Sequence, residues 1–125
     1  MAKLIMLICG LSGGLAVVLG AFASHGLKKK ISPDMISVFR TGVDYQFYHS
    51  FALALVGLSL MVSDIDQSKF LTWSFICFGT GIVLFSGSLY LLALTQKKIF
   101  GPITPLGGLF FIIGWLFFCL HWINY

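Results

Sequence analysis

The sequence has no glutamate and only four acidic residues, against eight lysines and arginines in 125 positions. Charged residues make up 10% of the chain, whereas soluble domains carry about 25%. Hydrophobic residues make up 58%, and the mean hydropathy is +0.99. Because so few charges cannot cover a water-exposed surface, the composition excludes an ordinary soluble protein and predicts a single-domain integral membrane protein.

Metal and redox motifs are also missing. The cysteines Cys9, Cys77 and Cys119 lie singly in apolar runs, without a C-x-x-C pair. This spacing excludes a disulfide framework and a zinc site, and buried cysteine behaves as a small hydrophobe. The histidines are scattered and no H-E-x-x-H occurs, so no metal and no cofactor is expected.

The net charge of +4 does not indicate a nucleic-acid partner. The basic residues lie mostly between the apolar runs, and no group of them interleaves with aromatic residues as in a nucleic-acid site. Their distribution is typical of a protein that is oriented in a lipid bilayer.

Four long apolar runs are separated by short polar segments. A helix of about 20 apolar residues is about 30 Å long, which matches the hydrocarbon core of a bilayer. The sequence therefore predicts an all-α fold, a four-helix transmembrane bundle that forms one membrane domain. The expected spans are residues 4–23, 43–62, 70–94 and 106–122.

The first run also has features of a signal peptide. Lys3 precedes it, and Ala21-Phe22-Ala23 resembles a cleavage site. The run is longer than the apolar region of a signal peptide, which has roughly 7–15 residues. We therefore interpret it as a transmembrane helix.

Small residues in the first run, among them Gly10-x-x-x-Gly14, indicate a face for close helix packing. Such a face serves packing within the chain or in a homo-oligomer. A different glycine pattern of the first run, Gly-Gly-Leu followed by a later glycine, recurs in the fourth run and raises the alternative of an inverted repeat like those of transporters. Because the match is so short, we interpret it as a shared requirement for close packing rather than as a repeat. The matching segments are residues 13–15 (GGL) with Gly20, and residues 107–109 (GGL) with Gly114.

The segments between the spans contain helix signals and turns. Ser32 followed by Pro33 predicts a helix start, with Ser32 as N-cap. A short interfacial helix is expected from Pro33 to about Phe39. Residues 63–69 are expected to form a polar turn, and residues 101–105 (GPITP) a rigid, non-helical entry to the fourth span.

The positions of lysine and arginine predict the orientation in the membrane. Six of them follow the first and third runs, and two lie at the N-terminus and in the second loop. Because basic residues stay on the cytoplasmic side, both termini are expected outside. Interfacial aromatic residues agree with this orientation. They are Trp73, Trp122 and Tyr125 at the outer interface, and Tyr45, Tyr48 and Tyr90 at the inner one.

Residues 40–50 (RTGVDYQFYHS) place polar groups around more than half of the start of the second span. Ionisable groups inside a membrane are expensive, so this part must be enclosed by protein or lie at the interface. Tyr45 and His49 lie at i, i+4 and share a face, as do Arg40 and Asp44.

In the predicted orientation the polar groups of all four helices converge at the cytoplasmic end. One interpretation is a binding pocket, with Asp44 as a proton or cation acceptor and His49 as its titratable partner. The alternative is structural, with an Arg40–Asp44 ion pair and interhelical hydrogen bonds. The predicted ligand-binding residues are His25, Arg40, Asp44, Tyr45, Gln46, Tyr48, His49, Ser86, Ser88, Tyr90 and Thr104.

A membrane enzyme is the least favoured class. Ser86-Gly87-Ser88 is not a G-x-S-x-G elbow, and no catalytic residue can be named. His121, close to the outer end of the fourth span, is expected to be an interfacial histidine.

Four motifs occur in order along the chain, at residues 20–27 (GAFASHGL), 41–50 (TGVDYQFYHS), 85–90 (FSGSLY) and 103–108 (ITPLGG). Together they resemble the domain-of-unknown-function 423 family, also classed as UPF0382, which is similar to eukaryotic transmembrane protein 256. Ser24 departs from the glycine usual in the family pattern. The resemblance implies a compact four-span protein of the bacterial inner membrane without an established activity.

Two functional hypotheses follow from the sequence. The first is a membrane protein that binds or transports an ion or small molecule through the polar cluster on its cytoplasmic side. The second is a structural or assembly module that packs against partner proteins or lipids, for example as a homo-oligomer through its glycine-rich helix faces.

Overall fold

The computed structural model describes residues 1–62 and 68–124, and every regular element in these residues is helical. The second half of the third span contains a π-helical segment, η1, which continues directly into α4. The elements are α1 (Ala2–His25), α2 (Pro33–Val62), α3 (Lys69–Gly81), η1 (Ile82–Ser86), α4 (Gly87–Thr95), the 3-10 turn η2 (Lys98–Phe100) and α5 (Ile103–Asn124).

Four of the helical stretches are long and apolar enough to cross a membrane, with α3, η1 and α4 acting as one span. The predicted all-α fold with four transmembrane helices is therefore confirmed. Each helical stretch is longer than the span expected within it, because the helices extend into the polar segments. The bounds of the membrane spans themselves stay a prediction.

Local capping explains where the helices begin. Ser32 accepts a hydrogen bond from the backbone N–H of Met35 at 3.3 Å, as expected for an N-cap. The helix that starts at Pro33 continues unbroken to Val62, so the predicted interfacial helix and second span are one element. Ser68 caps α3 in the same way by accepting from Leu71 N–H.

The predicted entry to the fourth span differs in part from the structure. Residues 103–105 are helical, so the expected non-helical entry is wrong for its last three positions. Pro105 fits there because the first turn of a helix has no intrahelical partner for its N–H groups. Most of the polar turn expected at residues 63–69 lies outside the described residues, and so does Tyr125; Ser68 and Lys69 already belong to the start of α3.

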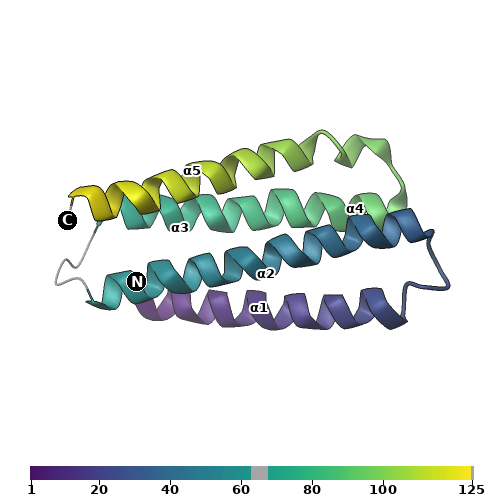
Figure 1. The fold of residues 1–125 in the computed structure, drawn as a ribbon, viewed down its shortest axis with the longest axis horizontal. Coiled ribbons are helices and arrows are strands. Elements are labelled where there is room, and N and C mark those ends of the chain that lie inside the picture. Colours follow the sequence, from purple (N-terminus) through teal and green to yellow (C-terminus); the bar gives the residue numbers. More distant parts are fainter. Residues whose placement is uncertain (63–67, 125) are drawn as a thin grey trace.

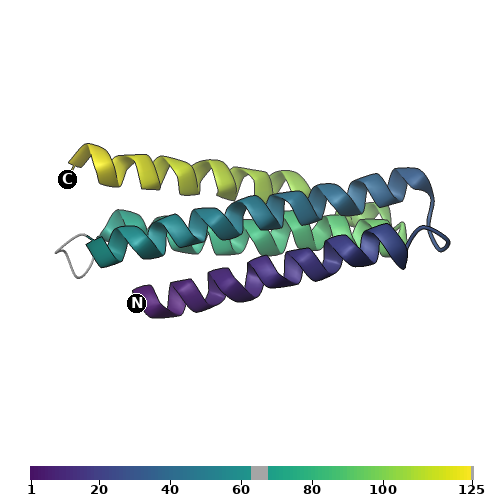
Figure 2. The same ribbon diagram turned by 60° about the horizontal axis from the view of Figure 1, so that its bottom comes forward.

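The helices form two adjacent pairs. α1 packs mainly on α2, and α5 packs mainly on α3, while α2 also contacts η1 and α4. Two views of the ribbon show α1 and α5 on opposite sides of the central helices, α2 and the α3–α4 span (Figure 1 and Figure 2). α2 is the most buried span, and its polar residues therefore meet neighbours on more than one side.

Both chain ends lie at one end of the bundle, and the α1–α2 and α4–α5 connections lie at the other (Figure 1). The two connections bring Lys28, Lys29, Lys30, Lys97 and Lys98 to that second end. The side of the membrane that this end faces stays a prediction.

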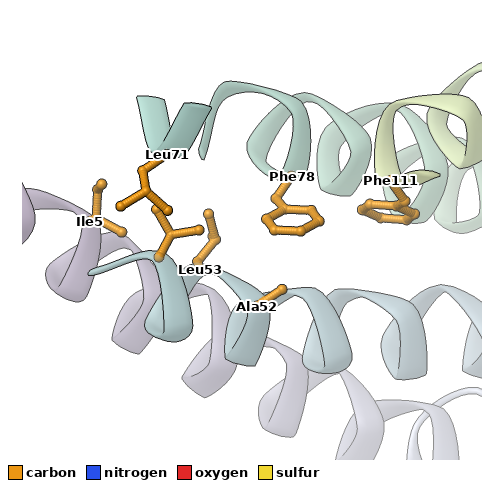
Figure 3. Packing of buried hydrophobic residues seen from close by; sticks show 7 residues of the cluster. Ile5, Ala52, Leu53, Leu71, Phe78 and Phe111 are labelled. Carbon is orange, nitrogen blue, oxygen red and sulfur yellow. The ribbon is translucent and has the colours of Figure 1, made fainter. Parts of the chain in front are cut away.

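The core runs along the interior of the bundle. Ile5, Leu53 and Leu71 belong to one cluster toward the chain ends, and Phe78 and Phe111 continue it farther along (Figure 3). A second buried cluster, toward the connections, contains Ala23, Leu27, Phe39 and Ala93. Large apolar side chains on the outside of α1 and α5 are exposed, as membrane-spanning helices require.

Glycines decide how closely the helices approach. A Cβ atom on Gly107 would lie 2.3 Å from the backbone nitrogen of Phe85, so α5 rests directly on the backbone of η1. Gly20 packs near Val43 of α2, whereas Gly10 and Gly14 have no atom within 4 Å of their Cβ positions. The predicted glycine face of the first span is therefore divided, with one part packed and the other facing outward.

Candidate functional site

The structure distributes the predicted ligand-binding residues over several places. Arg40 donates from Nη2 to the hydroxyl of Ser24 at 3.1 Å, and in the described part of the chain it makes no ion pair with Asp44. Asp44, His25 and Tyr48 have exposed side chains, with 59% exposure for Tyr48. None of these four residues lines either of the two grooves described below.

A hydrogen-bonded group joins α1, α2 and α4. Gln46, which is 4% exposed, donates from Nε2 to the carbonyl oxygen of Ser12 at 2.9 Å and accepts from the hydroxyl of Tyr90 at 2.8 Å. The hydroxyl of Ser50 lies 2.8 Å from that of Ser12. Because both ends of the Gln46 amide have partners, this group acts as an interhelical clamp.

A groove of about 470 Å³ runs over this clamp between α1 and the α3–α4 span. Apart from the clamp itself its lining is apolar, so its polar groups already serve the fold. The lining residues are Ile8, Leu11, Ser12, Leu15, Gln46, Ile82, Val83, Gly87 and Tyr90.

Two further predicted residues link α4 to α5. Ser88 donates to the carbonyl of Phe85 at 2.9 Å, and its oxygen lies 2.7 Å from the hydroxyl of Thr104. Ser86, the last residue of the π-helical segment, is fully buried. Its hydroxyl has no hydrogen-bond partner, and among residues 1–62 and 68–124 no other buried side-chain nitrogen or oxygen lacks one.

His49 has different surroundings. Its side chain is 6% exposed, and Nδ1 lies 2.8 Å from the carbonyl oxygen of Tyr45. A carbonyl only accepts hydrogen bonds, so Nδ1 carries the hydrogen and Nε2 of the neutral ring is an acceptor. No hydrogen bond to Nε2 is present among the described residues.

Aromatic rings hold this histidine in place. The His49 ring stacks on Phe111 with centroids 3.4 Å and planes 9° apart. The rings of Tyr45 and Phe85 pack with their centroids 4.5 Å apart, and the ring centroids of Trp115 and His49 are 6.4 Å apart. The histidine is therefore fixed on one face by Phe111 and on one edge by its own helix.

These rings line a second groove of about 470 Å³, here called the α2–α5 groove. None of its lining residues is an aspartate, lysine or arginine. The lining residues are Tyr45, His49, Phe85, Pro105, Gly108, Leu109, Phe111, Ile112 and Trp115.

Of the predicted residues, only Tyr45 and His49 line the α2–α5 groove. Phe85, Phe111 and Trp115 were not among the residues predicted for the site. Phe111 and Trp115 lie at i, i+4, so the periodicity of the fourth span could have placed them on one helix face. Nothing in the sequence indicated that this face meets His49.

His121 lies near the C-terminal end of α5, where its ring is enclosed by protein. Its side chain is 1% exposed, and Nδ1 lies 2.9 Å from the hydroxyl of Ser68 at the start of α3. The expected position at the membrane interface stays a prediction. Within the described residues, no three histidine, cysteine or acidic side chains come together as metal ligands would.

Comparison with known proteins tests the family resemblance. The model of the family "Protein of unknown function (DUF423)" matches residues 19–108. The chain belongs to this DUF423 family. The DUF423 match includes Tyr45, His49, Phe85 and Gly108 of the α2–α5 groove and ends before Phe111.

Relatives of this DUF423 protein carry membrane-protein names. It is similar to UPF0382 membrane protein YwdK of Bacillus subtilis, with 42% identity over 124 residues and 98% of each chain covered. A UPF0382 membrane protein of Staphylococcus aureus (strain bovine RF122 / ET3-1) is 43% identical over 114 residues, covering 91% of this chain and 90% of the relative.

A third relative, a UPF0382 membrane protein of Haemophilus influenzae, is 41% identical over 109 residues, covering 87% of this chain and 85% of the relative. No solved structure matches the chain. The family and the four spans together show a membrane protein.

Proposed function

We propose that this protein binds a small, largely apolar molecule in the α2–α5 groove, with His49 as the principal polar contact. The observation that carries the proposal is the free acceptor Nε2 on a histidine that is 6% exposed and lines the groove. Within the described residues the Ser86 hydroxyl is the buried side-chain polar atom without a partner, so the unpaired Nε2 of His49 is accessible from outside the protein. In apolar surroundings a polar atom without a hydrogen-bond partner is unfavourable. A bound molecule that hydrogen-bonds to Nε2 supplies a donor.

The shape and lining of the groove support a small molecule. Its volume of about 470 Å³ falls in the range of roughly 300–1,000 Å³ of known ligand pockets, which are mostly apolar with a few placed polar groups. An ion would need carboxylates or several carbonyl oxygens, and no carboxylate lines this groove. Of the alternatives that the sequence raised, a small molecule therefore has the stronger support.

The bilayer is the source from which such a molecule would enter. Leu109 and Ile112, which line the groove, are 54% and 58% exposed. In a membrane these side chains face lipid, so the groove communicates with the apolar phase. Binding from the bilayer explains why an apolar lining and a single histidine acceptor occur together.

We place the protein in the bacterial inner membrane, with both termini outside. The lysines of both inter-helix connections gather at one end of the bundle (Figure 1), and such residues are retained on the cytoplasmic side. The bacterial relatives are consistent with this location.

Blocking the groove tests the binding proposal. Gly108 lines it, and an added Cβ meets only the Phe85 ring at 3.8 Å, so the larger side chain of Gly108→Leu should enter the groove. Gly79→Leu is the matched control, because Gly79 has no atom within 4 Å of its Cβ position and does not line the groove.

Native mass spectrometry of gently purified protein gives the readout. Wild type and Gly79→Leu should retain a small-molecule adduct that Gly108→Leu loses. Equal adduct on all three proteins, or on none of them, would contradict groove binding.

Assembly is a second candidate function, favoured by the outward half of the α1 glycine face. Gly10 and Gly14 face open space at the spacing that lets two membrane helices approach closely. Here α1 would pair with α1 of a second copy. Gly14→Leu should then abolish a dimer that wild type and Gly79→Leu form in native mass spectra; a dimer unaffected by Gly14→Leu would exclude this contact.

A further inference from the structure

The orientation of His49 restricts the chemistry of the molecule that fits the α2–α5 groove. If the ring hydrogen were on Nε2, the lone pair of Nδ1 would face the carbonyl oxygen of Tyr45 at 2.8 Å. Two acceptors would then be in contact without a hydrogen between them. The hydrogen therefore stays on Nδ1, and Nε2 offers only a lone pair.

The ring has little freedom to change this arrangement. Phe111 covers one face at a centroid distance of 3.4 Å, and Tyr45 lies nearly parallel at 6.0 Å. Rotation of the imidazole would break both the stacking and the bond to the Tyr45 carbonyl. The direction of Nε2 is consequently a property of the packed helices.

The absence of charged aspartate, lysine and arginine from the groove lining further restricts the chemical class of the ligand. Its lining has no carboxylate to pair with a protonated amine or an imidazolium, and an unpaired charge in an apolar site is strongly unfavourable. The ligand's donor is therefore a neutral group. A hydroxyl meets this requirement, because alcohols and phenols keep their proton at neutral pH; the phenolic group of tyrosine has a pKa of about 10.

The walls favour a flat ring beside that hydroxyl. Phe85, Phe111 and Trp115 contribute aromatic surfaces to the groove, and aromatic rings pack best against one another in offset or edge-to-face contacts. The tail of such a molecule would lie along the exposed apolar side chains of α5.

We propose that the groove selects a lipid-soluble phenol, whose hydroxyl donates a hydrogen bond to Nε2 of His49. This inference rests on the proposed binding function and specifies its ligand class. It assigns to His49 the role of a specificity-determining contact, and to the aromatic rings the role of fitting the body of the ligand.

A matched pair of probes tests the donor requirement. Para-hexylphenol and its methyl ether, para-hexylanisole, share ring and tail but only the phenol has a donor. With wild type in lipid nanodiscs, the phenol should bind about tenfold or more tightly than the ether, because a bound ether would cover Nε2 without supplying a donor. Nitrogen NMR of isotope-labelled histidine should show a shift of Nε2 of His49 with the phenol alone.

Two variants test whether His49 and the groove are responsible for the preference. His49→Phe keeps a ring that can stack on Phe111 but removes both nitrogens, so it should bind both probes with equal, weak affinity. Gly108→Leu should bind neither probe, which distinguishes the groove from partitioning into lipid. If His49→Phe does not fold, the probe comparison and the Nε2 shift in wild type decide by themselves.

The possible outcomes test the phenol class separately from the proposed binding of a small molecule in the α2–α5 groove. Equal binding of phenol and ether by wild type, lost in Gly108→Leu, would overturn the phenol class and leave groove binding intact. A preference for the phenol that persists in His49→Phe would overturn the assignment to His49. Absence of binding of either probe to wild type would overturn both the ligand class and the proposed function.

Discussion

The imidazole of His49 on α2 lies face to face with the ring of Phe111 on α5, with centroids 3.4 Å and planes 9° apart. This contact joins a helix of the first pair to a helix of the second. Together with the bond from Nδ1 to the Tyr45 carbonyl, it fixes the orientation of a ring that lines the α2–α5 groove. Ring geometry and the proposed binding chemistry thus depend on the same side chain.

That coupling separates His49 from Asp44, which the sequence placed in the same polar cluster. Asp44 has an exposed side chain and does not line the groove, so Asp44→Asn should leave affinity for para-hexylphenol unchanged and alter the free energy of unfolding by less than about 0.5 kcal/mol. His49→Ala should lose the affinity. Isothermal titration and thermal unfolding in detergent measure both effects. A loss of affinity in Asp44→Asn would show that the Asp44 carboxylate contributes to binding.

Two adjacent glycines should respond oppositely to alanine. A Cβ on Gly107 would lie 2.3 Å from the backbone nitrogen of Phe85, whereas one on Gly108 would lie 3.8 Å from the ring of the same residue. Gly107→Ala must displace the backbone of α5 from η1, so the free energy of unfolding should fall by about 1–3 kcal/mol or more. Gly108→Ala should be neutral or stabilising, by up to about 1 kcal/mol, since alanine favours the helix. Equal thermal stability of the two variants would show that α5 does not rest on η1.

Because Gln46 and Tyr90 are hydrogen-bonded to each other, we expect the effects of substituting them on the free energy of unfolding to be non-additive. Tyr90→Phe leaves the buried Gln46 oxygen without its donor and should lower the free energy of unfolding by about 1–3 kcal/mol. Gln46→Met combined with Tyr90→Phe removes both partners and should cost less than the sum of the two single changes. Tyr48→Phe is the control, because Tyr48 is 59% exposed. Additive losses in thermal unfolding would argue against the clamp.

Two buried serines allow a test of hydrogen-bond satisfaction. The Ser86 hydroxyl is buried without a partner in the described residues, whereas Ser74 donates to the carbonyl of Gly114 at 3.0 Å. Ser86→Ala should therefore be neutral or stabilising, and Ser74→Ala should lower the free energy of unfolding by about 0.5–1.5 kcal/mol. A marked loss on Ser86→Ala would indicate that this hydroxyl has a partner in the membrane, such as a bound water.

The orientation can be tested with single cysteines placed at the two ends of the bundle. In a variant without Cys9, Cys77 and Cys119, a membrane-impermeant maleimide should label Lys3→Cys in intact cells and Lys29→Cys only after the membrane is opened. The reason is that the connection containing Lys29 carries the charges that stay on the cytoplasmic side. The reverse labelling pattern would invert the proposed topology.

The sequence predicted those features that depend on neighbours along the chain. The four spans follow from local hydropathy, and the start of α2 follows from the N-cap of Ser32. Periodicity also placed Tyr45 and His49 on one face of α2, and both line the same groove. Four ordered motifs were sufficient to indicate the family, which the match over residues 19–108 confirms.

Tertiary structure decided which of these groups meet. α2 lies between the other helices, so Gln46 faces Ser12 of α1 and Tyr90 of α4, while His49, three residues later, faces Phe111 of α5. The sequence showed the polar residues of α2 but could not show which neighbouring helix each of them contacts. The π-helical turn of η1 and the direct backbone contact at Gly107 also arise only on packing. By itself, therefore, the sequence determined the membrane class and the four spans, because hydropathy and capping act locally. The separation of a clamp from a binding groove depends on contacts between distant segments, and only the folded bundle determines those.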